Sequence, residues 1–141
     1  MTLKQIYKIF PTVTICIGFL EEIRWANTPV CPYCDAQNYT PLKEGHRYHC
    51  NTCNTSFSVT VRTVFHRTKC DLQKWFYAIY LLLHADKEIT VRDLANKIGV
   101  AKDTALLMST RVKNHQRENK TLFSKIIEKI NTHERKNTNN P

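Results

Sequence analysis

The sequence contains no apolar run that approaches the ~18 residues needed to cross a lipid bilayer. One apolar stretch near the N-terminus, "VTICIGFL" at Val13–Leu20, ends at Glu21 and Glu22. No cleavage site of the A-x-A type follows it, so we interpret it as the buried face of a helix and not as the core of a signal peptide. We therefore expect a cytoplasmic, nucleoid-associated chain that contacts no membrane and keeps its cysteines reduced.

Acidic side chains are scarce, and internal repeats are absent. The 141 residues include 12 Asp and Glu against 21 Lys and Arg, which gives a formal net charge of +9. Such an excess of positive charge favours a polyanionic partner, although solubility alone is the other interpretation. Apolar residues make up 42% of the chain, which is enough for one compact domain or for two small ones.

Four of the six cysteines form two C-x-x-C pairs, Cys31 with Cys34 and Cys50 with Cys53, separated by 15 residues. In a reducing compartment such pairs are more often metal ligands than disulfides. Zn²⁺ binds four thiolates tetrahedrally, and two C-x-x-C turns on adjacent hairpins can supply them. The spacing predicts one structural zinc ion with no open position for a catalytic water. Two disulfides or an iron–sulfur cluster are the alternatives.

The residues around these cysteines predict a zinc ribbon of about three strands over residues 30–68. β-type residues flank a turn at Lys43–Gly45, and "SFSVTV" at Ser56–Val61 alternates as a strand does. His46 and His49 lie close to the cysteines in the sequence. Because four thiolates are already available, we expect both histidines to be exposed strand residues and not zinc ligands.

Residues 1–29 predict an N-terminal helical segment. Two short helices between Thr2 and Trp25 are expected to be interrupted at Pro11. We expect Pro11 near the first turn of the second helix, where its missing N–H is harmless. The apolar pattern places Cys16 in the core.

Residues 69–117 predict a three-helix domain that contains a helix-turn-helix. Its last two helices span about Val91–Ile98 and Lys102–Gln116, and Gly99 stands where a left-handed turn residue is needed. In a DNA-binding helix-turn-helix the second of these helices enters the major groove. Many pairs of antiparallel helices are only structural, so the pattern leaves that alternative open.

The first helix of this domain follows Cys70, for which no catalytic partner can be identified, and begins after Asp71, a residue type favoured at helix N-caps. It carries a broad apolar stripe typical of a core helix. Trp75 is therefore expected in the core and not as a platform for stacking bases.

Positive charge is unevenly distributed along the chain. Residues 89–117 contain six basic and two acidic residues, a net charge of +4. Residues 31–70 contain five basic and two acidic residues, a net charge of +3, whereas residues 71–88 carry −1. The excess thus lies on the predicted ribbon and helix-turn-helix, where phosphate groups would be met.

Residues 118–141 predict a short helix followed by a disordered tail. The helical pattern is "TLFSKIIEKI", and the chain offers no apolar residue to a core after Ile130.

The order of these motifs resembles the N-terminal part of bacterial insertion-sequence transposases that carry a zinc ribbon before a helix-turn-helix. The resemblance covers about residues 3 to 115. The blocks that carry it are "FPT" at Phe10–Thr12, "FLEEIRW" at Phe19–Trp25, "CPYC" at Cys31–Cys34, "YHCNTCNTSFSV" at Tyr48–Val59, "TVFHRTK" at Thr63–Lys69, "KWFYAIYLL" at Lys74–Leu82, "LANKIGVAKDTA" at Leu94–Ala105, and Met108.

In that family a ribonuclease-H-like domain with an acidic catalytic triad follows. Here only about 25 residues follow Arg117, against the ~100 or more of such a fold, and their acidic residues are Glu118, Glu128 and Glu134. The resemblance therefore implies a zinc-dependent, sequence-specific DNA-binding module that is not itself an enzyme. Two alternatives are an inactive or partner-dependent transposase fragment and a protein-binding zinc-ribbon adaptor.

The expected partner is double-stranded DNA, for example transposon terminal repeats, with a second copy or a full-length transposase as a further partner. Groove geometry places the start of the second helix nearest the bases, and other basic positions nearer the phosphates. The residues expected at base edges are Lys102, Asp103, Leu106 and Ser109. Those expected at phosphates are Thr90, Arg92, Arg111 and Lys113, together with the ribbon residues Lys43, Arg47, Arg62 and Arg67.

Overall fold

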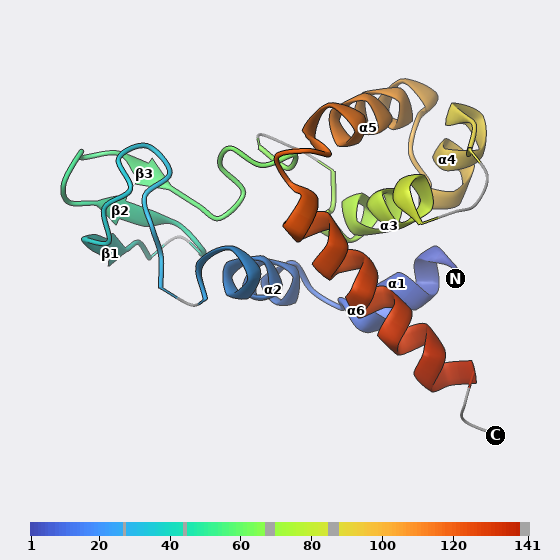
Figure 1. The fold of residues 1–141 in the computed structure, drawn as a ribbon, viewed down its shortest axis with the longest axis horizontal. Coiled ribbons are helices and arrows are strands. Elements are labelled where there is room, and N and C mark those ends of the chain that lie inside the picture. The colour runs from blue at the N-terminus through green and yellow to red at the C-terminus, as the bar shows by residue number, and fades with distance from the viewer. Residues whose placement is uncertain (27, 44, 67–69, 85–87, 139–141) are drawn as a thin grey trace.

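The computed structural model describes residues 1–26, 28–43, 45–66, 70–84 and 88–138, and this part of the chain contains six helices and one three-stranded antiparallel sheet. The predicted α+β class, with a four-cysteine ribbon, is confirmed. Figure 1 shows the sheet at one end of the molecule and most helices at the other. The elements are α1 (Leu3–Ile9), α2 (Val13–Trp25), β1 (Tyr39–Pro41), β2 (Tyr48–Cys50), β3 (Ser56–Phe57), α3 (Leu72–Leu83), α4 (Val91–Ile98), α5 (Lys102–His115) and α6 (Lys120–Thr138).

Threonine side chains define where the two N-terminal helices begin. Thr2 and Gln5 form a capping box at α1, in which each side chain accepts from the other's backbone N–H, at 3.3 and 2.8 Å. The Oγ1 of Thr12 accepts from the N–H of Ile15 and caps α2. Pro11 therefore directly precedes the cap and lies near the first turn of α2, as predicted. The threonine supplies the cap, and the proline stays outside the helix where no N–H is needed.

Aromatic rings join the N-terminal helices to α3. Phe76 of α3 is fully buried, and its ring centroid lies 4.8 Å from that of Phe10 and 5.7 Å from that of Phe65. Phe19 of α2 lies 6.3 Å from Phe76. Trp75 is 1% exposed, which confirms that it belongs to the core. One hydrophobic core therefore includes residues from α1, α2, α3 and the segment that follows the ribbon.

The helices α4 and α5 pack on each other and on α3, as the helix-turn-helix prediction requires. Gly99 has φ 68°, the left-handed conformation that glycine adopts without strain, and its N–H donates to the carbonyl of Ala95 at 2.9 Å. Lys74 of α3 donates from Nζ to the carbonyl of Gly99 at 3.0 Å. The turn is thus closed by a local bond and attached to α3 by a second one.

Asp71 occupies the N-cap position of α3, but its side chain makes no capping hydrogen bond. Its carboxylate instead accepts from the hydroxyl of Tyr7 at 2.9 Å. Burial, followed by this bond and the carboxylate charge, raises the pKa of Tyr7 to about 12. The prediction of Asp71 as the N-cap residue is therefore confirmed, and its carboxylate bonds Tyr7 of α1 in place of the helix backbone.

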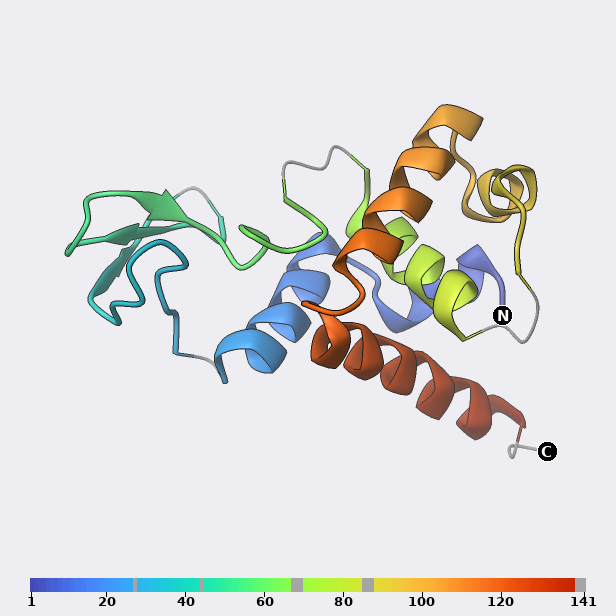
Figure 2. The same ribbon diagram turned by 45° about the horizontal axis from the view of Figure 1, so that its top comes forward.

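The helix α6 has 19 residues and corrects the prediction of a short helix with a disordered tail. Its apolar face is buried at Phe123, Ile126 and Ile130. Beyond Ile130 the hydroxyl of Tyr80 in α3 donates to a carboxylate oxygen of Glu134 at 3.0 Å. Figure 2 shows α6 beside α2 and α3. The hydrogen bond between Tyr80 and Glu134 thus holds α6 against α3 beyond the end of the apolar pattern. The last three residues, which were also predicted to be disordered, lie outside the described residues.

The ribbon is a sheet in the order β1-β2-β3, and it packs against the end of α2. The ring of Trp25 lies 5.9 Å from Tyr48 and 5.7 Å from Phe57 in edge-on contact. Arg24 donates from Nη1 to the carbonyls of Val59 and Val61 at 2.6 and 2.7 Å. Because α2 also contacts α3 and α6, it connects the ribbon to the helical core.

None of the helices in the described ranges combines the length and the apolarity that a membrane span requires. The division into four segments at residues 29, 68 and 117 stays a prediction.

Candidate metal centre and nucleic-acid interface

The two C-x-x-C turns have the same backbone geometry. In the first, the carbonyl of Cys31 accepts from the N–H of Asp35 at 2.9 Å, and the N–H of Cys31 donates to Ala36 at 3.0 Å. The second repeats both bonds, at 2.9 and 2.8 Å, with Cys50 and Asn54 in the corresponding places. Asp35 and Asn54 have φ 62° and 59°, a region that Asp and Asn tolerate better than most residues. The residue after each pair therefore lets the chain fold back and turn both sulfurs to one side.

The four sulfur atoms lie within 4.8 Å of one another. The Sγ atoms of Cys31 and Cys53 are 3.7 Å apart, and those of Cys34 and Cys50 are 3.5 Å apart. A disulfide needs about 2.05 Å, so neither pair is bridged. A tetrahedron with Zn–S distances of about 2.3 Å has edges of roughly 3.8 Å. The sulfurs are thus spaced as ligands of one tetrahedral ion.

Protonation of the cysteines is uneven within this cluster. The backbone N–H of Cys53, with that of Thr52, lowers the pKa of Cys50 to about 6. At Cys34 the N–H of Ala36 acts to lower the pKa, but desolvation and hydrogen bonds with the other three sulfurs outweigh it and raise the pKa to about 12. Four adjacent thiolates repel one another, whereas a divalent cation stabilises all of them. The donor set and its spacing therefore fit Zn²⁺.

Within the described part of the chain the two histidines of the ribbon lie outside this metal-binding group. The prediction that both are exposed strand residues is wrong in part, because both are half-buried and His46 lies in the turn before β2, with only His49 in the strand. The Nε2 of His46 lies 3.3 Å from the Oγ1 of Thr14 in α2. His49 pairs in the sheet with Thr40 on one side and Ser56 on the other. The sulfurs alone thus form the candidate metal centre.

The outer face of α5 presents three of the four residues predicted at base edges. Lys102 and Asp103 in the first turn are exposed, and Leu106 is 53% exposed, so packing does not account for it. Ser109 is only 6% exposed and lies on the buried face. We therefore no longer expect Ser109 to contact bases. Helical periodicity explains the difference, because Ser109 follows the buried Ala105 by four positions.

One exposed residue of α5 was missed by sequence reasoning. Leu107 is 50% exposed beside Leu106. It follows Asp103 by four positions and so shares its face, which is the signal that could have identified it. Two adjacent exposed leucines give this face an apolar part in addition to its charged residues.

The residues of α4 and α5 predicted to contact phosphates differ in exposure and in their hydrogen bonds. Thr90 caps α4 by accepting from the N–H of Asp93 at 3.1 Å, and Arg92 and Lys113 are exposed. Arg111 is half-buried, and its Nη1 donates to the carbonyl of His66 at 3.4 Å. Arg111 therefore connects α5 to the segment that leaves the ribbon.

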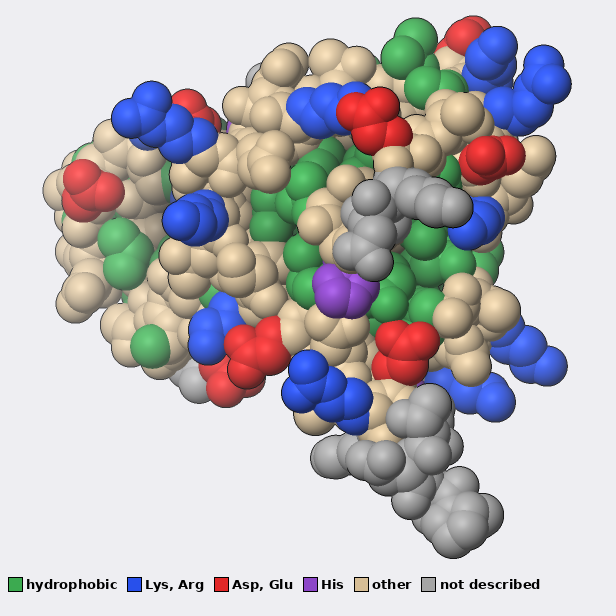
Figure 3. Space-filling view, turned by 45° about the vertical axis from the view of Figure 1, so that its right-hand side comes forward, with side chains coloured by type: hydrophobic (Ala, Val, Ile, Leu, Met, Phe, Trp, Pro, Cys, Tyr) green, Lys and Arg blue, Asp and Glu red, His purple; other side chains and the backbone are tan. Residues whose placement is uncertain are grey.

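Three basic residues of the ribbon in the described part of the chain, Lys43, Arg47 and Arg62, are exposed. Arg47 donates from Nη2 to the Oγ of Ser56 at 3.0 Å, and the guanidinium carbon of Arg62 lies 5.1 Å from the centre of the Tyr33 ring. Lys43 is exposed, and the predicted phosphate contact at Arg67 lies outside the described residues. Figure 3 shows basic and acidic side chains interspersed on one face. Charge on that face therefore does not form one continuous patch.

Two thiols lie outside the candidate metal centre, the buried Cys16 and the half-buried Cys70. Cys16 is fully buried in α2, as predicted, and burial raises the pKa of its thiol to about 12. Burial also raises the pKa of Cys70. Both thiols are therefore protonated near neutral pH.

Two comparisons with known proteins agree with this geometry. Residues 14–56 match a family described as a transposase zinc-ribbon domain, and the match includes all four clustered cysteines. A protein of Halobacterium salinarum, described as an uncharacterized protein in the transposable element ISH50, is 32% identical over 100 residues. The aligned part is 69% of this chain and 33% of that protein, so this chain spans about a third of the relative's length. No solved structure gives a significant match. Residues 14–56, with their four clustered cysteines, therefore match the transposase zinc-ribbon family in sequence and in the arrangement of the sulfur atoms.

Proposed function

We propose that the protein binds double-stranded DNA sequence-specifically, with one structural Zn²⁺, and that its sites are the terminal repeats of a transposable element. It would act in the nucleoid, with a second copy or a full-length transposase as a further partner. The observation that carries the proposal is the exposed face of α5, held by α4 and α3 in a helix-turn-helix.

The exposed side chains of α5 have the chemistry that base recognition needs. Lys102 can donate to guanine O6 and N7, and Asp103 can accept from cytosine N4. Leu106 can contact a thymine methyl group. All three are exposed, and all three lie in the first half of α5, the part of a recognition helix that usually meets the bases. They give the helix a donor, an acceptor and an apolar contact.

The metal centre would contribute to DNA binding by stabilising the folded ribbon. Bound Zn²⁺ supplies structural coordination by four thiolates and leaves no position for water. The ribbon would then hold Arg47 and Lys43 for contact with the DNA backbone, which lengthens the footprint beyond one groove. Because the ribbon holds these residues only when it is folded, we expect DNA binding to depend on Zn²⁺.

The first test compares two lysines of α5. Lys102→Ala is expected to cost roughly 1–3 kcal/mol on the preferred site and to relax one base position, because it removes a base contact. Lys113→Ala is expected to weaken all sequences about equally and to lower the salt slope by about one, because it removes a phosphate contact. Fluorescence anisotropy over a range of salt concentrations measures both effects, after site selection has identified the preferred duplex.

If both variants bind every duplex as tightly as the parent at moderate salt, the helix-turn-helix is only structural. A parent protein that binds no DNA at any salt concentration would favour a protein-binding adaptor instead.

The proposal assigns no strand cleavage to this chain. After Arg117 it contains three glutamates and no aspartate, a poor source for the acidic residues that hold two metal ions in strand transfer. Purified protein with Mg²⁺ or Mn²⁺ is therefore expected to leave the bound DNA intact, as read on denaturing gels. Metal-dependent nicking by a homogeneous preparation would contradict this and would favour an active site assembled with a partner.

A further inference from the structure

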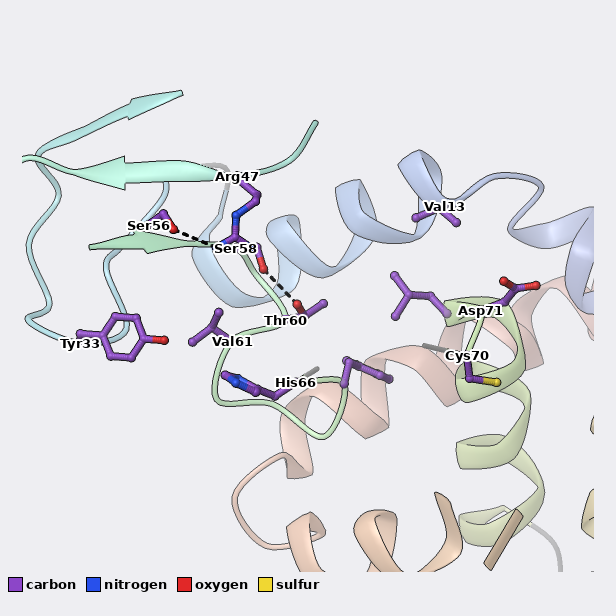
Figure 4. A pocket seen from close by; sticks show the side chains of 12 residues that line it. Val13, Tyr33, Arg47, Ser56, Ser58, Thr60, Val61, His66, Cys70 and Asp71 are labelled. Atoms are coloured by element: carbon purple, nitrogen blue, oxygen red, sulfur yellow. Dashed lines mark hydrogen bonds between the residues drawn. The ribbon is translucent and has the colours of Figure 1, made fainter. Parts of the chain in front are cut away.

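A cleft of about 480 Å³ lies between the ribbon and the start of α3, and the helix-turn-helix proposal does not use it. Figure 4 shows Tyr33 at the ribbon end and Cys70 and Asp71 at the α3 end. The wall between them comes from the segment that leaves β3, including Ser58 and Thr60. Its volume is in the range of small-molecule sites, which hold groups of the size of a nucleotide.

The ribbon side of the cleft carries spare hydrogen-bonding capacity. Arg47 uses one N–H on the Oγ of Ser56, and no carboxylate lies within 4.0 Å of it among the described residues. A guanidinium has five donors, so Arg47 can also bind a phosphate oxygen. The hydroxyls of Ser58 and Thr60 lie 3.0 Å apart, and each can make a further bond. This wall can therefore bind both a phosphate and the edge of a base.

One flat group lines the ribbon end of the cleft, and a second lies beside it outside the lining. Tyr33 is 45% exposed although it lies between two metal ligands, and the guanidinium carbon of Arg62 lies 5.1 Å from the centre of its ring. Tyrosine rings and guanidinium planes are the groups on which proteins stack unpaired bases. An exposed aromatic ring that no core explains, next to two arginines, has the composition of a single-strand binding site.

The charges favour an anion at the ribbon end. Arg47 lines that end, Arg62 lies against Tyr33 just outside the lining, and the one acidic lining residue, Asp71, lies at the opposite end (Figure 4). Its carboxylate already accepts from the hydroxyl of Tyr7. A negatively charged ligand would therefore place its charge near Arg47.

The cleft is physically connected to α5. Its lining includes His66, whose carbonyl accepts from Arg111 of α5 at 3.4 Å. A strand that leaves a duplex bound on α5 would thus pass close to this segment. We propose that the cleft binds one unpaired nucleotide of the DNA, with its base stacked on Tyr33 and its phosphate on Arg47. This inference rests on the proposed DNA binding and adds a single-stranded part to the substrate.

The test uses three probes: the selected duplex with blunt ends, the same duplex with a thymidine extension on either strand, and an oligothymidine single strand. An extension on one strand is expected to raise the affinity of the full chain about 5-fold or more, the effect of stacking one base. Tyr33→Leu is expected to remove this gain and to leave blunt-duplex affinity unchanged. Tyr33→Phe, which keeps the ring, is expected to retain it.

Thr60→Val provides a second variant away from the metal ligands, and it is expected to reduce the gain without affecting the blunt duplex. The zinc content of each variant confirms that the ribbon is intact. Equal affinity for blunt and extended duplexes, or a gain that survives in Tyr33→Leu, overturns the inference while leaving the proposed duplex binding in place. Loss of duplex binding itself overturns the proposed function. In that case a Tyr33-dependent affinity for oligothymidine would still support the cleft, and no such affinity would overturn it.

Discussion

Replacing Cys50 by serine is expected to release the metal and to unfold the ribbon. Cys50 is fully buried, and its sulfur lies within the four-atom cluster that fits one tetrahedral ion. The ribbon has little else to stabilise it, since its strands have two or three residues each. Structural zinc contributes about 10–16 kcal/mol of apparent binding free energy in small domains, and that free energy becomes folding free energy.

Metal analysis should find about one zinc per chain in the parent protein and none in Cys50→Ser. Hydrogen exchange should show loss of protection in residues 31–57 and retained protection in α3. Strong chelators should have the same effect on the parent. His49→Gln is the matched control, because His49 neighbours Cys50 on β2 but is outside the metal-binding group. It is expected to keep its zinc. Full protection of the ribbon without bound metal would contradict the structural role of the ion.

Replacing Phe76 by alanine is expected to destabilise the helical part of the protein by about 3–5 kcal/mol. Phe76 is fully buried, and its ring contacts Phe10, Phe19 and Phe65. Removing it leaves a cavity that no single helix can close. Because Phe76 and these partners come from three predicted segments, residues 1–29, 30–68 and 69–117, all of them should lose stability in one transition.

Chemical denaturation followed by circular dichroism measures this loss. Ile15→Ala is the control, since Ile15 is 46% exposed on α2, and a change within about 0.5 kcal/mol is expected there. A loss from Phe76→Ala no greater than the control would mean that the aromatic cluster does not hold these segments together. Two separate transitions would instead support independent folding of the predicted segments.

Local patterns predicted the elements of this fold well. The C-x-x-C pairs identified the metal ligands because a turn of that length places both sulfurs on one side of the chain. The helices α4 and α5 follow from apolar periodicity, and Gly99 marks their turn because few other residues adopt its φ without strain. In each case the local conformation depends on residues a few positions apart, so a short sequence pattern can predict it.

Contacts between segments far apart in the chain were not predicted. Asp71 is the N-cap residue that its neighbours indicate, but nothing near it in the sequence shows that Tyr7 provides the partner of its carboxylate. The end of α6 looked disordered because its residues are polar, yet Tyr80 binds Glu134 there. Pairing over such separations leaves no periodic signal, so neither outcome could be predicted from the local pattern.

The sequence by itself determined the four candidate metal ligands, the positions of α4 and α5 and the family resemblance, because these depend on short-range spacing and residue type. Only the tertiary structure decided that the sulfurs converge, that Ser109 faces inward while Leu107 faces outward, and that Tyr33 and Arg47 share a cleft. Those facts depend on how α2, α3 and the ribbon pack together. Packing is set by the sum of many weak contacts between distant segments, which no single stretch of sequence contains.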